Sequence, residues 1–189
     1  MMEFFAKICD NLLGKYDDYA HTVFYSELPR NRKDDTPLFL MVKKQFDYNK
    51  LRLFFISLLW RASISKTDAC SLIHLGKYED IALKILKGEM QDDTTLFHPV
   101  IFKKTEANKL SDVAFINSGK YNGQIKYAFL APGYTFDFII NTKPIKYDKN
   151  IKSLSLNENE LAVIETDIDV TKAWPTPEYM KKFFPSKKI

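Results

Sequence analysis

Residues 48–62 carry the sequence YNKLRLFFISLLWRA, which does most to decide how this chain folds. Apolar residues recur there at helical spacing along one side: Leu51, Phe54, Phe55, Leu58, Leu59 and Ala62. Leu53, Ile56 and Trp60 occupy the other side. A helix that is apolar all round packs inside a domain, so this stretch predicts a central core helix capped by Asp47.

The rest of the first half is also predicted to be largely helical. The expected elements are a helix over residues 4–13, a turn over 69–75, a helix over 77–87, and β-leaning stretches over 21–28 and 38–45. Gly14 can end the first helix, Asp68 can cap the turn, and Gly88 stands just past the end of the second helix.

After Asp92 and Asp93 the hydrophobic period changes from helical to alternating. β-branched and aromatic runs predict strands over 100–103, 113–117, 125–130, 135–141 and 161–165, and a short helix is expected over 178–184. Asn122-Gly123 and Pro132-Gly133 are turn signals. The pattern predicts an α+β fold, with a helical N-terminal half, a mainly antiparallel β-meander and a short C-terminal helix.

Length and composition suit one soluble domain. The 189 residues are expected to form a single domain over 1–189, and the change of period allows a mainly helical sub-lobe, 1–92, and a mainly β sub-lobe, 93–189. The longest apolar run, residues 51–60, is shorter than the roughly 20 residues of a membrane span, so no membrane contact is expected. Two distant cysteines, Cys9 and Cys70, and a start without signal-peptide features favour a cytoplasmic location.

The net charge of +4 is unevenly distributed. Residues 172–189 hold five Lys and one Glu, and the rest of the chain is balanced. This basic tail, which includes Lys181 and Lys182, can attract phosphate groups, or it can be a solvated terminus. A polar loop bounded by Pro29 and Pro37 adds Arg30, Arg32 and Lys33.

Motifs of known catalytic and metal-binding sites are weak in this sequence. The three histidines lie far apart and no Cys-x-x-Cys pair is present, so neither a zinc site nor a cofactor is expected. Cys70 and His74 are four residues apart and would share a face if they were helical, which allows a thiol nucleophile or a buried small side chain. Asp112 with Gln124 and Lys126 has the loose shape of a Mg²⁺-dependent nuclease site on two strands, or of a hairpin with outward polar residues.

Arg61 lies in the densest motif of the chain, LWRASIS over residues 59–65. In the last turn of a helix an arginine can satisfy terminal carbonyls and interact favourably with the helix dipole. It can instead point into a cleft and bind a phosphate or a carboxylate through two parallel hydrogen bonds. Both interpretations stay open.

Two stretches together resemble an uncharacterised family of bacterial and phage proteins. The first is CDNLLGKYDDYA, residues 9–20, and the second combines residues 51–65 with LGKYED, residues 75–80. Members of that family often begin with an HNH-like, treble-clef zinc module. Cys9 matches the second cysteine of a pair in that module, whereas Ala6 stands where the first would be. The chain therefore resembles the C-terminal body of the family without its zinc-binding head, and no catalytic residue can be carried over.

These observations favour a non-catalytic binding domain of an HNH-associated family, which binds nucleic acid or a partner nuclease, by analogy in phage–host conflict. The candidate contact residues are Arg30, Arg32, Lys33, Arg61, Lys181 and Lys182, with exposed Tyr and Phe rings available to stack on bases. Two alternatives remain: a protein-interaction or inhibitor module without nucleic-acid binding, and a small enzyme that uses Cys70 with His74 or Asp112 with Gln124 and Lys126.

Overall fold

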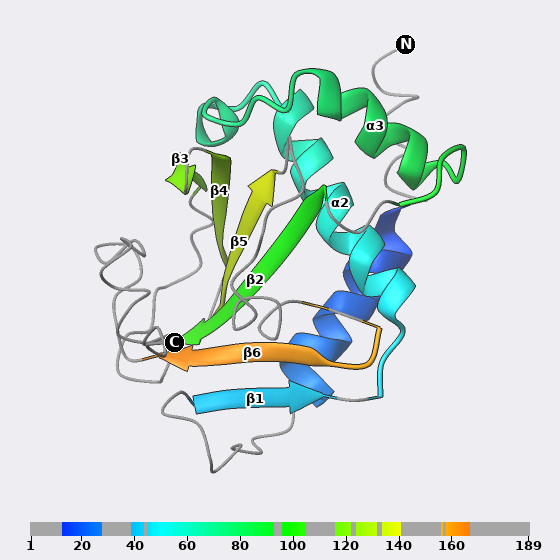
Figure 1. Cartoon of the computed structure of the whole chain (residues 1–189), viewed down its shortest axis with the longest axis vertical. Helices are drawn as coiled ribbons and strands as arrows, with labels where there is room; N and C mark the ends of the chain where they lie inside the picture. The colour runs from blue at the N-terminus through cyan, green and yellow to red at the C-terminus, as the bar shows by residue number, and fades with distance from the viewer. Residues whose placement is uncertain are drawn as a thin grey trace, which may run out of the picture.

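Helices from the first half of the chain pack against one face of a six-stranded sheet in the computed structural model (Figure 1). The structure describes residues 13–27, 39–43, 45–92, 96–104, 116–121, 124–131, 134–140, 156 and 158–166. Residues 13–21 are helical, and they are followed by the π-helix η1 (Thr22–Glu27), α2 (Tyr48–Ile64), the 3₁₀-helix η2 (Asp68–Cys70) and α3 (Lys77–Leu86). The strands are β1 (Phe39–Lys43), β2 (Phe97–Lys104), β3 (Ile116–Tyr121), β4 (Gln124–Ala131), β5 (Tyr134–Ile140) and β6 (Leu161–Thr166). The predicted α+β class is confirmed.

The sheet has the order β1-β6-β2-β5-β4-β3. β3, β4 and β5 form the predicted antiparallel meander, and β2 pairs antiparallel with β5. β1 pairs antiparallel with β6, whereas β2 and β6 run parallel. β1 therefore brings a strand from the N-terminal half into a sheet that the sequence had assigned to the second half. Of the helix predicted over residues 4–13 only Leu13 is described, and the helix predicted over 178–184 lies outside the described residues.

α2 is the central helix that the sequence predicts, and it ends two residues later than expected. The side chain of Asp47 accepts a hydrogen bond from the backbone N–H of Lys50 at 3.0 Å, which is the expected N-terminal cap. Leu51, Phe55, Ile56 and Leu59 are fully buried on the helix. The ring of Phe55 packs against those of Phe136 and Phe138 of β5, and all four α2 residues belong to the same buried cluster as these rings.

α3 ends at a glycine, as predicted. Gly88 has φ of 72°, a left-handed conformation that side chains other than glycine rarely adopt. Its N–H donates to the carbonyl of Ile85, and the N–H of Glu89 donates to the carbonyl of Lys84. This pair of bonds is a Schellman motif, which satisfies carbonyls that the helix end leaves open.

Two local predictions for the N-terminal region are wrong. Residues 21–27 are helical, although their β-branched and aromatic composition favoured a strand. Tertiary packing overrides that propensity, because Val23 and Phe24 are buried on one side of the helix and the hydroxyl of Tyr134 donates to the carbonyl of Phe24 at 2.6 Å. Gly14, expected to end a helix, lies within the helical run over residues 13–21.

The core draws on both halves of the sequence. One cluster of buried apolar residues extends from Leu13 to Val163 and so includes residues on both sides of residue 92. Every residue of β5 is buried, including those on the face that points away from the helices. Within the described ranges, each helix is too short or too polar to cross a bilayer.

Candidate functional site

The strand register places the start of β1 beside the end of β6, and each of these strand ends is joined along the chain to a basic segment. Arg30, Arg32 and Lys33 lie outside the described residues, in the connection that joins η1 to the first residue of β1. Lys181 and Lys182 also lie outside them, beyond the last residue of β6. Phe39 at the start of β1 pairs with Glu165 next to the end of β6. Both segments are therefore attached at the same end of the same strand pair.

β2 ends at this corner as well. Lys103 pairs with Glu165 and Lys104 pairs with Thr166, because β2 and β6 run parallel. The arrowheads of β2 and β6 and the tail of β1 accordingly lie together at the lower left of Figure 1. We call this corner, where Phe39, Lys103, Lys104, Glu165 and Thr166 meet, the basic end of the sheet.

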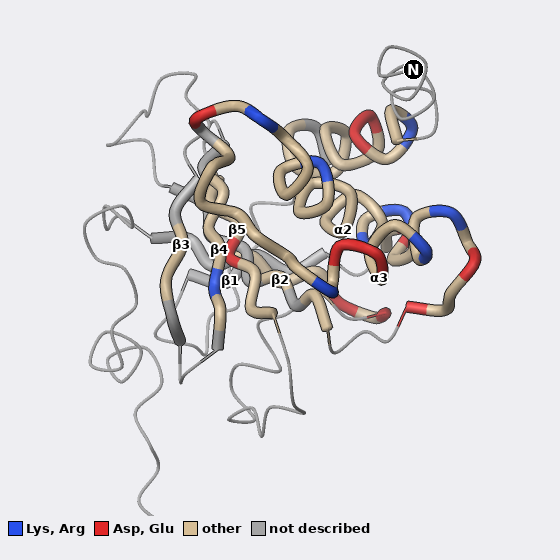
Figure 2. Tube along the Cα trace, turned by 90° about the horizontal axis from the view of Figure 1, so that it is seen from above, with Lys and Arg blue, Asp and Glu red and all other residues tan. Residues whose placement is uncertain are grey.

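Charge in the described part of the chain is balanced. The described residues contain as many Asp and Glu as Lys and Arg. Residues of both signs are interspersed along the helices and their connections (Figure 2). The net charge of +4 therefore belongs to residues outside the described ranges. Those residues include Arg30, Arg32, Lys33 and the C-terminal lysines.

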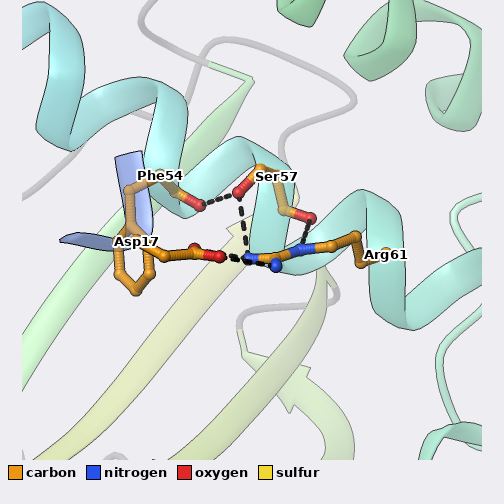
Figure 3. Close-up of polar contacts among 4 residues, drawn as sticks. All are labelled: Asp17, Phe54, Ser57 and Arg61. Carbon is orange, nitrogen blue, oxygen red and sulfur yellow. Dashed lines mark hydrogen bonds and ion pairs between the residues drawn. The ribbon is translucent and has the colours of Figure 1, made fainter. Parts of the chain in front are cut away.

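Arg61 makes an internal ion pair in the structure (Figure 3). Its Nη1 and Nη2 atoms donate to the two carboxylate oxygens of Asp17 at 2.8 and 2.7 Å. Nη2 also donates to Ser57 Oγ at 3.3 Å, and Nε donates to the carbonyl of Ser57 at 3.4 Å. Ser57 Oγ donates in turn to the carbonyl of Phe54. The network joins the helix over residues 13–21 to α2.

The ion pair with Asp17 shows what the guanidinium of Arg61 binds in this structure. The guanidinium forms the bidentate carboxylate contact that the second interpretation expected, but its partner is a residue of the same chain. The two side chains are 35% and 38% exposed, so the pair is partly solvated and contributes modestly to stability. A phosphate would have to compete with Asp17 for the guanidinium.

A buried ion pair lies on the sheet face that points away from the helices. Lys126 on β4 and Asp137 on β5 are each only 3% exposed, and Lys126 Nζ lies 2.5 Å from Asp137 Oδ2. Asp137 pairs directly with Ala128, so Lys126 reaches it diagonally across the two strands. Asp137 Oδ1 and the hydroxyl of the neighbouring Thr135 are buried and have no hydrogen-bond partner in the part of the chain that the structure describes.

Burial shifts the titration of both members of this pair. It lowers the pKa of Lys126 below the ordinary 10.5, and the nearby carboxylate of Asp137 opposes that shift. It raises the pKa of Asp137 above the ordinary 3.8, and the ammonium of Lys126 opposes this shift in turn. Each group therefore has a weakened preference for its charged form.

Two of the three residues of the nuclease candidate lie in the part of the chain that the structure describes. Asp112 lies outside the described residues, four positions before β3 begins at Ile116, which pairs with Phe129. Gln124 pairs with Tyr121 at the opposite end of the same hairpin. Lys126 is buried against Asp137, so the expectation of outward polar residues is wrong for Lys126. Within the described ranges, no group of three His, Cys, Asp or Glu side chains is placed to hold a metal ion.

Cys70 and His74 do not share a helical face. Cys70 is the last residue of η2, which spans three residues, and residues 71–75 are not helical. The N–H and the carbonyl of His74 both bond to the hydroxyl of Tyr127 on β4, at 3.1 and 2.8 Å. These two bonds join the connection between α2 and α3 to the sheet.

Two charged pairs were missed by sequence reasoning. Arg52 is buried on α2, where its Nε lies 2.5 Å from Asp92 Oδ2 and its Nη1 donates to the carbonyl of Phe97. The other is the pair of Lys126 with Asp137, and the sequence signal of Asp137 is a carboxylate in the middle of a largely apolar strand. Comparison of the chain with family models, with curated proteins and with solved structures finds no match in any of the three.

Proposed function

We propose that this chain is a non-catalytic binding domain that holds nucleic acid through basic side chains at the basic end of its sheet. The body of the domain, in this proposal, is a neutral scaffold that presents charged segments. The resemblance to HNH-associated proteins suggests the same class of partner, and phage–host conflict as the setting.

The pairing of Phe39 with Glu165 carries the proposal. Lys33 precedes Phe39 by six residues, and Lys172 follows Thr166 by six residues. Six extended residues reach at most about 20 Å, so the two basic segments start within a short distance of one another. Lys172 opens the basic tail, and Lys181 and Lys182 follow Thr166 by 15 and 16 residues. In this proposal side chains of both basic segments contact phosphates of one strand, although they are more than 130 residues apart in sequence.

The distribution of charge along the chain also supports the proposal that the domain binds nucleic acid. A scaffold with equal numbers of acidic and basic residues adds no net attraction of its own for a polyanion. The five candidate contacts are Arg30, Arg32, Lys33, Lys181 and Lys182. Each phosphate that they neutralise releases condensed counterions, so the affinity should fall steeply with salt. Arg61 is not in this group, because Asp17 already holds its guanidinium.

Fluorescence anisotropy with labelled single- and double-stranded DNA and RNA tests the proposal. We expect binding that weakens by about 100-fold between roughly 50 and 200 mM salt, for about five phosphate contacts on a single strand. The double variant Lys181→Glu/Lys182→Glu should bind more weakly and with a shallower salt dependence. Lys77→Glu/Lys84→Glu is the matched control, because both residues are exposed on α3, on the far side of the molecule from the basic end (Figure 1).

Two outcomes contradict the proposal. Absence of binding at low salt excludes nucleic acid as the partner and favours the alternative of a protein-interaction or inhibitor module, whose affinity depends on a few aromatic anchors. Cleavage of the probes in the presence of Mg²⁺, on a gel, contradicts the non-catalytic role. In that case Asp112→Asn tests the small-nuclease alternative with Asp112, Gln124 and Lys126.

A further inference from the structure

His21 and Tyr25 form an exposed pair of rings where the helix over residues 13–21 passes into η1. Their ring centroids are 4.9 Å apart and their planes are inclined by 31°. Tyr25 is 51% exposed, and within the described ranges it is the one aromatic among the exposed large hydrophobic residues. π-helical turns are rare and occur frequently at functional sites, which makes this exposed pair a candidate for binding.

The sheet supports Tyr25 from behind. The ring of Tyr134 meets that of Tyr25 edge-on, with centroids 5.7 Å apart and planes at 84°. The hydroxyl of Tyr134 donates to the carbonyl of Phe24, and the ring of Phe24 packs 5.2 Å from that of Phe136. One side of η1 is thus fixed in the core while the other carries the exposed rings. A ring that is held before a ligand arrives loses little freedom on binding.

The ring pair adjoins the basic end of the sheet. Tyr134 is the first residue of β5 and pairs with Lys103, which pairs on its other side with Glu165. The described residues alone therefore connect Tyr25 to the corner where β1 begins and β2 and β6 end. Nucleic acid held at that corner would pass beside the exposed rings.

We propose that His21 and Tyr25 form a stacking platform for an unpaired nucleobase, so that the nucleic acid bound is single-stranded. The inference rests on the proposed function, which it deepens by naming the substrate class. Every base has a π face, so stacking on an aromatic ring tolerates any sequence. Bases inside a duplex are already stacked on one another and offer no free face.

Substitution of Tyr25 tests the platform. The probe is a labelled single-stranded oligonucleotide that contains 2-aminopurine, whose fluorescence is quenched when it stacks, and its duplex serves as the comparison. Tyr25→Ala and Tyr25→Leu should weaken single-strand binding by about 5- to 100-fold and relieve the quenching, whereas Tyr25→Phe keeps both. Leu72→Ala is the control, since Leu72 is also 51% exposed and precedes α3.

The outcomes separate this inference from the proposed function. Salt-sensitive binding of the wild type that Tyr25→Leu leaves unchanged, or equal affinity for the single strand and the duplex, overturns the platform and leaves the basic end intact. No binding by the wild type overturns both. Because Tyr25→Leu and Tyr25→Phe both retain a bulky apolar side chain, their comparison decides the matter even if Tyr25→Ala fails to fold.

Discussion

Phe39, the first residue of β1, lies opposite Glu165, the last but one residue of β6. β1 comes from the N-terminal half of the chain and β6 from its C-terminal part, so this pairing joins two regions that the sequence keeps far apart. β2 lies on the other side of β6, and its final lysines occupy the same corner. The function proposed for the chain depends on this convergence rather than on any one motif.

The ion pair between Arg61 and Asp17 should contribute to stability and not to nucleic-acid binding. Arg61→Lys keeps the positive charge but loses the two parallel bonds to Asp17, and we expect it to lower the free energy of unfolding by about 0.5–1 kcal/mol. Chemical denaturation measures this change, and anisotropy measures binding of the same variant. Loss of oligonucleotide affinity at unchanged stability would instead assign Arg61 to phosphate contact, as its motif also allowed.

Removing one member of the buried pair between Lys126 and Asp137 should lower the free energy of unfolding far more than replacing both members. Asp137→Leu leaves the Lys126 ammonium buried without its carboxylate, and we expect a loss of about 3–5 kcal/mol. Lys126→Met/Asp137→Leu removes both charges and should be neutral or more stable by about 1–4 kcal/mol. Urea unfolding of the three proteins checks this. A double variant as unstable as the single one would mean that the pair stabilises the fold through its charges.

The pH dependence of the same comparison follows from the two pKa shifts. The pKa of Asp137 in the folded protein is raised above 3.8. At pH values between 3.8 and that folded-state pKa, the folded state binds more protons than the unfolded state, so stability falls as pH rises. The pKa of Lys126 is lowered below 10.5, so between its folded value and 10.5 the unfolded state binds more protons and stability increases with pH. The double variant lacks both effects.

The stability advantage of Lys126→Met/Asp137→Leu over the wild type should therefore be greatest between these two pH windows. It should shrink towards both acidic and alkaline pH. Unfolding midpoints measured at mildly acidic, neutral and alkaline pH give the difference directly. A difference that does not vary with pH would contradict the assignment of both shifts to burial.

Gly88→Ala should destabilise the end of α3. No heavy atom lies within 4 Å of a Cβ added at Gly88, so the cost comes from its φ of 72° alone and should be about 1–2 kcal/mol. Gly14→Ala is the matched control, because Gly14 has equally open space but lies within a helix. It should raise the free energy of unfolding by about 0.5–1 kcal/mol. Thermal melts of the two variants should shift in opposite directions, and a shift in the same direction contradicts the account.

Sequence reasoning recovers the elements whose signal is local. The start of α2 follows from the Asp47 cap and its end lies two residues past the predicted one, and Gly88 marks the end of α3. Alternation and turn residues predict the strands of the meander, and β4 and β5 begin within one residue of their predicted starts. β3 spans Ile116–Tyr121, later in the chain than the predicted 113–117. The β prediction for residues 21–28 is wrong because packing of Phe24 against β5 outweighs their β propensity.

The candidate site could be predicted only in part, because register is not a local property. Arg30, Arg32, Lys33 and the terminal lysines are visible in the sequence, but the β1–β6 pairing that relates them is not. Asp137 escaped notice because alternation predicts one exposed face for a strand, whereas both faces of β5 are buried. The contact between the rings of His21 and Tyr25 likewise depends on a helix where the β propensity of residues 21–28 had predicted a strand.

The most direct measurement is the salt dependence of single-stranded oligonucleotide binding by the wild type, Lys181→Glu/Lys182→Glu and Lys77→Glu/Lys84→Glu. The account predicts that log affinity falls linearly with log salt for the wild type and for the α3 variant. It predicts a slope shallower by about 1.4 for the Lys181 and Lys182 variant, which loses two phosphate contacts. Equal slopes for all three proteins, or no binding at low salt, would contradict the claim that the basic end of the sheet binds nucleic acid.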